Sequence, residues 1–109
     1  MAKKTTLKKS IKSKIEKFYS ELKEAGFSVR EIILFGSQAK GDAKDYSDID
    51  LAVISNSFGK DYLEEMMALK KLASKVDFSI EPHPLTPVDL KEEFNPLADE
   101  VRKWGIRVI

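Results

Sequence analysis

Apolar residues recur along this chain with two different periods, and the changes of period mark out its elements. Residues 7–25 carry apolar side chains at three- and four-residue steps, which is the pattern of one face of an amphipathic helix. Residues 29–35 end in a continuous apolar run, typical of a buried strand, whereas apolar side chains in 48–53 alternate as in a strand with two different faces. The whole pattern predicts helices at 7–25, 61–75, 87–94 and 96–104 and strands at 29–35, 48–53, 76–81 and 106–109.

The lengths of the connections indicate how the strands pair. Ten residues, 38–47, lie between a glycine-serine turn and the second strand, which is too short for a parallel crossover with a full helix and suits an antiparallel return. The helix at 61–75 is long enough for a right-handed parallel crossover to the third strand, which we expect Pro82 and Pro84 to end. The sequence therefore predicts an α/β fold, a small mixed β-sheet flanked by helices, in a single domain 1–109 with a frayed end at 1–5.

Composition narrows the classes of protein to which the chain can belong. The 109 residues are 42% apolar and 34% charged and include no cysteine, which excludes disulfides, thiolate metal sites and cysteine nucleophiles and fits a reducing cytoplasm. No apolar run approaches the roughly 20 residues of a membrane helix, and no secretory signal is expected. Residues 1–17 carry seven lysines against one acid, Glu16. We interpret them as a solvated helix face, with a basic arm for nucleic acid or an acidic partner as the alternative.

The acids at the start of the second strand form the most informative pattern. Gly36 and Ser37 are followed, after ten residues, by Asp48-Ile49-Asp50. The period of a strand places Asp48 and Asp50 about 7 Å apart on one face. Two such acids repel each other unless a cation lies between them, and Mg²⁺ prefers carboxylate oxygens and substrate phosphates. The alternative is a solvated strand face, but acids are disfavoured in strands.

The turn before these acids suits an anion. Gly36 lets the backbone approach a phosphate, and the hydroxyl of Ser37 can donate to phosphate oxygens, with a short helix expected at 37–40. Alone this would be an ordinary turn, and the spacing to the acids gives it weight. The parallel crossover returns Asp77 to the same edge of the sheet. We therefore predict Asp48, Asp50 and Asp77 as metal ligands and catalytic acids of a two-metal phosphoryl or nucleotidyl transfer.

The string GSQAKGDAKDYSDIDLAV, residues 36–53, resembles the DNA polymerase β-like nucleotidyltransferase superfamily, and within it the minimal nucleotidyltransferases (MNT group) of prokaryotes. The resemblance runs over residues 29–80 and implies a polymerase β-like core with Mg²⁺, two ions, as cofactor and ATP as substrate. It also places Asp77 as the family's third acid, by its position after the helix. Members of this group pair with a helical HEPN protein, and several are antitoxins that transfer AMP to a tyrosine of that partner and so silence its RNase activity. The resemblance thus implies a protein adenylyltransferase, the antitoxin of a HEPN/MNT toxin-antitoxin pair, in a hetero-oligomer.

Other functions stay open from the sequence. The same chemistry could act on a small molecule or an RNA end, although such relatives usually carry an acceptor-binding domain for which 109 residues leave no space. The chain could also be a non-catalytic nucleotide-binding subunit that sequesters a partner. Asp77 has an alternative as a structural acid at the strand edge. We expect Lys40, Lys44 and His83 to be solvated, and we expect neither direct nucleic-acid binding nor membrane association.

Overall fold

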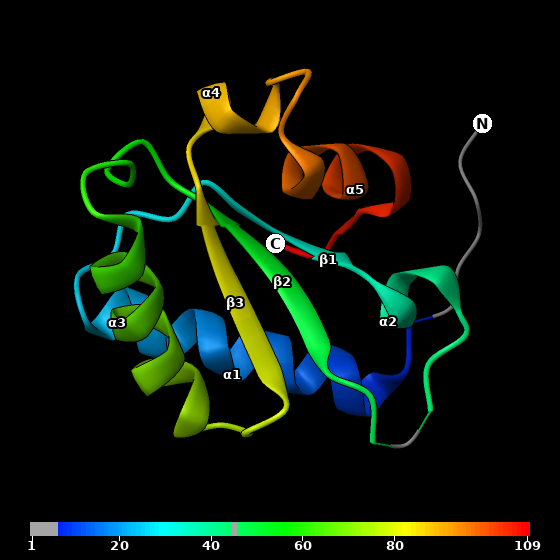
Figure 1. The fold of residues 1–109 in the computed structure, drawn as a ribbon. Helices are drawn as coiled ribbons and strands as arrows, with labels where there is room; N and C mark the ends of the chain where they lie inside the picture. Colours follow the sequence, from blue (N-terminus) through cyan, green and yellow to red (C-terminus); the bar gives the residue numbers. More distant parts are fainter. Residues whose placement is uncertain (1–6, 45) are drawn as a thin grey trace.

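Four strands form one mixed sheet with helices on both faces (Figure 1). The computed structural model describes residues 7–44 and 46–109, so the predicted frayed end at 1–5 lies outside the described residues. The strands are β1 (Glu31–Phe35), β2 (Ile49–Ile54), β3 (Ile80–Leu85) and β4 (Ile106–Arg107), in the sheet order β3-β2-β1-β4. The helices are α1 (Lys9–Glu24), α2 (Ser37–Lys40), α3 (Tyr62–Ser74), α4 (Pro87–Leu90) and α5 (Pro96–Trp104).

The pairing of the central strands follows the predicted topology. β1 and β2 are antiparallel, with Phe35 opposite Asp50, and β2 and β3 are parallel, with Asp50 opposite Glu81. β4 pairs antiparallel with β1, on the side of β1 that faces away from β2. The end of β1 and the starts of β2 and β3 therefore meet at one edge of the sheet, which is the arrangement predicted from the connection lengths.

Alternation along β2 divides its side chains between two cores. Ile49, Leu51 and Val53 pack with the buried faces of α1 and α3, where Phe18 is fully buried. Ala52 and Ile54 pack on the other face with residues of α4 and α5. In Figure 1, α1 and α3 lie below and to the left of the sheet, and α4 and α5 lie above it. Because period two separates the faces, Asp50 belongs to the α5 face.

The predicted position of the third strand, 76–81, is wrong. β3 runs from Ile80 to Leu85 and includes both prolines that were expected to end it. Its ladder with β2 uses the odd-numbered positions: the N–H of Ile49 donates to the carbonyl of Ser79 at 2.8 Å, and the N–H of Ser55 donates to that of Leu85 at 3.0 Å. Pro82 and Pro84 thus occupy positions that face away from β2, where an edge strand needs no N–H donor.

The helices that close the α5 face are fixed by side-chain caps. Thr86 and Asp89 form a capping box at α4, and the side chain of Asn95 accepts the N–H of Ala98 at the start of α5. α4 ends at Leu90, earlier than the predicted residue 94. Carbonyls at and after the end of a helix lack partners within it, and the guanidinium of Arg102 donates to two of them, those of Leu90 at 2.6 Å and Glu92 at 3.0 Å. Across the described residues, no helix has the length and apolar character needed to cross a membrane.

Candidate active site

Gly36 joins the end of β1 to α2 with a backbone that only glycine adopts readily. Its φ is 74° and its ψ is −156°, and it is the N-cap residue of α2. A Cβ at this position would collide with Oδ2 of Asp50 and would lie 3.2 Å from the Cγ of that residue. The predicted short helix at 37–40 is confirmed. The glycine-serine turn and Asp50 therefore lie side by side, as the antiparallel pairing of β1 and β2 predicts.

The two acids of the Asp48-Ile49-Asp50 segment sit at the start of β2. Asp48 immediately precedes the strand and is exposed, whereas the side chain of Asp50 is 30% exposed and lies on the α5 face. Ile49 and Leu51, at 1% and 0% exposure, anchor the segment in the opposite core. The loop before the acids is tied by Ser47, whose hydroxyl accepts the N–H of Lys44 at 2.8 Å. The carboxylates are thus carried by a rigid element at an accessible edge.

Glu81 is an acid that the sequence analysis did not single out. It lies opposite Asp50 on the neighbouring parallel strand. Ile80 belongs to the core of α1 and α3, while Leu85 belongs to the core of α4 and α5, so alternation places Glu81 on the same face as Asp50. The signal was present in the sequence as alternation from Ile80 through Pro82 to Pro84. It was missed because the prolines were expected to end the strand.

Asp77 is not on a strand but in the turn between α3 and β3. Its carboxylate contacts Nζ of Lys14 at 2.8 Å and accepts hydrogen bonds from the N–H of Ser79 at 2.8 Å and from its hydroxyl at 2.6 Å. Lys14, followed by Ser79, holds the pKa of the Asp77 carboxyl well below its usual range. Asp77 thus fastens the turn to α1, and Glu81, not Asp77, is the acid that lies opposite Asp50 in the sheet.

The donor set at this edge fits a hard divalent cation, although it is not a complete cage. The side chains available are carboxylates, which are the ligands that Mg²⁺ prefers together with substrate phosphates. Within residues 7–44 and 46–109, no three His, Cys, Asp or Glu side chains are grouped closely enough to hold a metal on their own. A cation here would therefore need oxygens from a bound substrate.

Comparison with known proteins gives this arrangement a family. Residues 12–103 match the sequence model of the nucleotidyltransferase domain. The chain belongs to this nucleotidyltransferase family. Protein MJ1305 of Methanocaldococcus jannaschii, which carries the provisional name protein adenylyltransferase, is 32% identical over an alignment of 95 residues. The match covers 82% of this chain and 65% of that protein. The chain thus spans less than two thirds of the length of this curated relative.

Solved structures share the fold. A crystal structure of a toxin-antitoxin with AMP-PNP matches with a TM-score of 0.64 and 25% identity, covering 90% of this chain and 72% of that chain. A mutant form of the toxin-antitoxin MntA-HpeT matches with a TM-score of 0.63 and 23% identity over the same shares of the two chains, which supports the fold alone. The predicted polymerase β-like architecture is consistent with both.

His83 is more enclosed than the sequence suggested. The expectation of surface placement is only partly correct, because the side chain is 24% exposed on the edge strand β3. Its Nε2 lies 3.7 Å from Oδ1 of Asp50, and its ring centroid is 5.4 Å from that of Phe35. The imidazole ring is therefore a neighbour of both Phe35 and the carboxylate of Asp50.

Lys40 is engaged by α5 and does not project freely toward the acids. Its Nζ lies 3.3 Å from Oε2 of Glu100 and 5.2 Å from the centroid of the Trp104 ring. Both contacts join α2 to the last helix. Lys44 is exposed, as expected.

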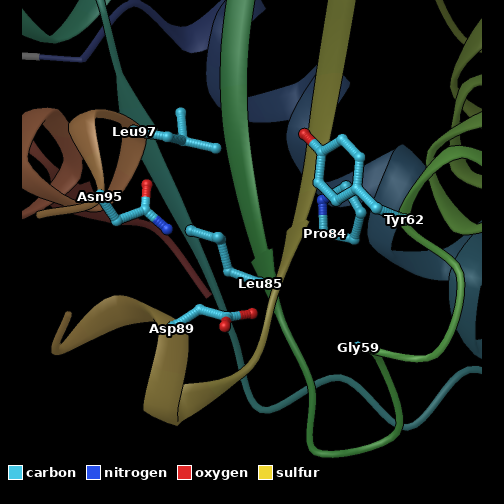
Figure 2. A pocket seen from close by; sticks show the side chains of 7 residues that line it. All are labelled: Gly59, Tyr62, Pro84, Leu85, Asp89, Asn95 and Leu97. Carbon is cyan, nitrogen blue, oxygen red and sulfur yellow. The ribbon is translucent and has the colours of Figure 1, made fainter.

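A cavity of about 430 Å³ lies at the opposite end of β3 (Figure 2). Asp89, Asn95 and Leu97 stand on one side of it and Tyr62 and Pro84 on the other, and Leu85 lies between them. Two of its polar residues are already used as helix caps, since Asp89 accepts from the N–H of Thr86 and Asn95 accepts from that of Ala98. Leu85 is four residues beyond Glu81, about 13 Å along the strand, so the cavity is separate from the acids.

Proposed function

We propose that this chain is a metal-dependent nucleotidyltransferase that transfers AMP from ATP to a hydroxyl group of a partner protein. The observation that carries the proposal is the direct approach of Gly36 to Asp50, which joins a phosphate-binding type of turn to the acids of β2. Membership of the nucleotidyltransferase family supports the reaction class. This reaction requires no covalent intermediate with the protein, because enzymes accelerate phosphoryl-type transfers mainly by positioning the reactants and neutralising charge.

Each residue at this edge has a role that its chemistry allows. Gly36 leaves room for the triphosphate beside the backbone, and the hydroxyl and amide of Ser37 donate to its oxygens. Asp48, Asp50 and Glu81 would hold two Mg²⁺ ions together with the phosphates. Bound Mg²⁺ supplies neutralisation of phosphate charge and a lower pKa for the attacking hydroxyl. Asp77, the third acid predicted from the sequence, is replaced in this proposal by Glu81, because Lys14 and Ser79 already engage its carboxylate.

A protein acceptor is favoured by the relatives. The MJ1305 protein is named for protein adenylyltransferase activity, and a solved neighbour is a toxin-antitoxin with AMP-PNP. The resemblance of residues 36–53 to the MNT group adds the identity of the partner, a helical HEPN-type protein, and the role of antitoxin in the cytoplasm. In this proposal the partner supplies the acceptor hydroxyl.

The test is transfer of label from ATP that is labelled at the α-phosphate. Purified protein is incubated with host lysate and Mg²⁺, with and without EDTA, and the products are separated into protein, RNA and small molecules. We expect a labelled protein band that requires Mg²⁺. Label on RNA or on a small molecule would keep the reaction and refute the protein acceptor. Binding of ATP without transfer to any fraction would refute the enzyme and favour a sequestering subunit.

A further inference from the structure

Lys70 of α3 reaches around the outer edge of β3 and binds three oxygens there. Its Nζ donates to the carbonyl of Ile80 at 2.6 Å, to that of Phe78 at 3.0 Å and to Oε2 of Glu81 at 3.2 Å. A lysine ammonium has three donors, so this geometry uses all of them. The side chain is 34% exposed, so these hydrogen bonds, and not burial alone, hold it in place.

The carbonyls that Lys70 binds belong to the edge that faces away from β2. Because odd-numbered residues of β3 form the ladder with β2, Ile80 directs its carbonyl outward. Lys70 therefore fixes the first residue of β3 at the point where the strand begins. The same ammonium holds the next side chain along the strand, that of Glu81.

Glu81 needs a cation nearby because of its neighbour on β2. Glu81 and Asp50 are opposite each other on adjacent strands, whose spacing is about 4.8 Å, and they share a face. Like charges in this relation repel and push the side chains apart. Lys70 offsets part of that repulsion through its contact with Oε2 of Glu81.

The Lys70–Glu81 pair is accessible from outside the fold. A hollow of about 140 Å³ between α3 and the edge of β3 is lined by Met66, Met67 and Pro82 together with the pair itself. One side of the Lys70–Glu81 pair thus borders solvent-accessible space on the α3 side of the strand.

We propose that Lys70 is a positioning residue for nucleotidyl transfer, which acts by fixing the carboxylate of Glu81, the residue opposite Asp50 on the neighbouring strand. The inference rests on the proposed function and on the role that it gives to Glu81. Lys70 itself contacts neither nucleotide nor acceptor in this account. Its effect on the reaction passes through Glu81.

The experiment compares Lys70→Met, which keeps the length of the side chain and removes its charge, with Lys70→Arg and with Lys71→Met. Lys71 is the exposed neighbour on the same helix and serves as the matched control. Mn²⁺ affinity in the presence of AMP-PNP is measured by electron paramagnetic resonance, and kcat and KM for ATP are measured separately. We expect Lys70→Met to weaken Mn²⁺ affinity and to lower kcat by about 10- to 100-fold. Lys70→Arg should restore most of both, and Lys71→Met should resemble the wild type.

A double-mutant cycle with Glu81→Gln separates this role from a purely structural one. If Lys70 acts through Glu81, Lys70→Met changes Mn²⁺ affinity by about twofold or less when Glu81 is already Gln. An equal loss in both backgrounds, or unchanged Mn²⁺ affinity in a folded Lys70→Met protein, overturns the proposal and leaves Lys70 as a clamp on the β3 edge. If the wild type transfers no nucleotide, the proposed function fails, but the Mn²⁺ cycle still decides the role of Lys70. Should Lys70→Met fail to fold, the comparison of Lys70→Arg with the wild type decides, since a folded Arg variant with lost affinity contradicts the proposal.

Discussion

Gly36→Ala puts a methyl group where the carboxylate of Asp50 lies. The backbone at this position, with φ 74° and ψ −156°, belongs to a region that is essentially restricted to glycine and costs other residues about 1–3 kcal/mol. The added Cβ also meets Oδ2 of Asp50 and lies 3.2 Å from its Cγ. Overpacking of this kind costs a further 1–3 kcal/mol or so, unless Asp50 moves. We therefore expect a loss of about 2–6 kcal/mol of unfolding free energy, or a displaced Asp50 at lower cost.

Gly41→Ala is the matched control for backbone strain. Gly41 also has a positive φ, 86°, but a Cβ there would meet nothing within 4 Å. Its replacement should lower the unfolding free energy only through the strained left-handed backbone, by about 1–2 kcal/mol. Thermal unfolding followed by circular dichroism gives the two stabilities, at roughly 4–8 °C per kcal/mol for a domain of this size. Mg²⁺-dependent transfer, measured on the folded fraction, gives the effect on the site.

The two variants separate strain from contact with the acid. Gly36→Ala should lose more stability than Gly41→Ala and should also lose transfer, whereas Gly41→Ala should keep transfer per folded molecule. If Gly36→Ala is no less stable than Gly41→Ala and transfers nucleotide at the wild-type rate, the close approach of Gly36 to Asp50 has no part in the site.

Three further predictions concern the acids and the metal. Glu81→Gln should lower the transfer rate at least about tenfold, whereas Asp77→Asn should leave it within about twofold; the opposite order would restore Asp77 as the third ligand. Asp77→Asn should lower the unfolding free energy at pH 7 by about 1 kcal/mol, because its partly exposed ion pair with Lys14 is lost. Because the pKa of Asp77 is lowered in the folded protein, its carboxylate stabilises the fold fully at pH values above the ordinary aspartate pKa of about 3.9. The difference in unfolding free energy between the wild type and Asp77→Asn should therefore shrink as the pH falls below that value. A difference that does not change with pH would contradict this prediction. EDTA should abolish labelling and added Mg²⁺ should restore it, whereas transfer that persists in EDTA would exclude a metal role.

The parts of the fold that depend on local pattern could be predicted from the sequence. The apolar stripe of α1, the alternation of β2 and the proline-led start of α5 are all local features, and α5 occupies the predicted residues. The antiparallel and parallel pairings followed from the lengths of the connections. The contact between Gly36 and Asp50 was implied by those pairings, because an antiparallel return brings the end of one strand beside the start of the next.

The third strand could not be placed in the same way, because its position depends on sheet order. Proline is excluded from a central strand but tolerated at an edge, and only the full order β3-β2-β1-β4 shows that β3 is an edge. The predicted strand lies four residues before the observed one, so Asp77 was expected on the strand and the strand position of Glu81 opposite Asp50 was missed. The ion pair of Asp77 with Lys14 joins segments 63 residues apart and leaves no local signal in the sequence.

The central claim is that Asp48 and Asp50 carry a metal-dependent nucleotidyl transfer, and the rate of that transfer tests it most directly. Initial rates of AMP transfer from α-phosphate-labelled ATP to the labelled acceptor are measured with Mg²⁺ for the wild type, Asp48→Asn, Asp50→Asn and Asp42→Asn. Asp42 is an exposed acid in the same loop and controls for the loss of charge. Because a ligand of a catalytic metal contributes several kcal/mol, the account predicts that both site variants fall at least about 100-fold while Asp42→Asn stays near the wild type. Equal rates for the folded site variants and the wild type would contradict it.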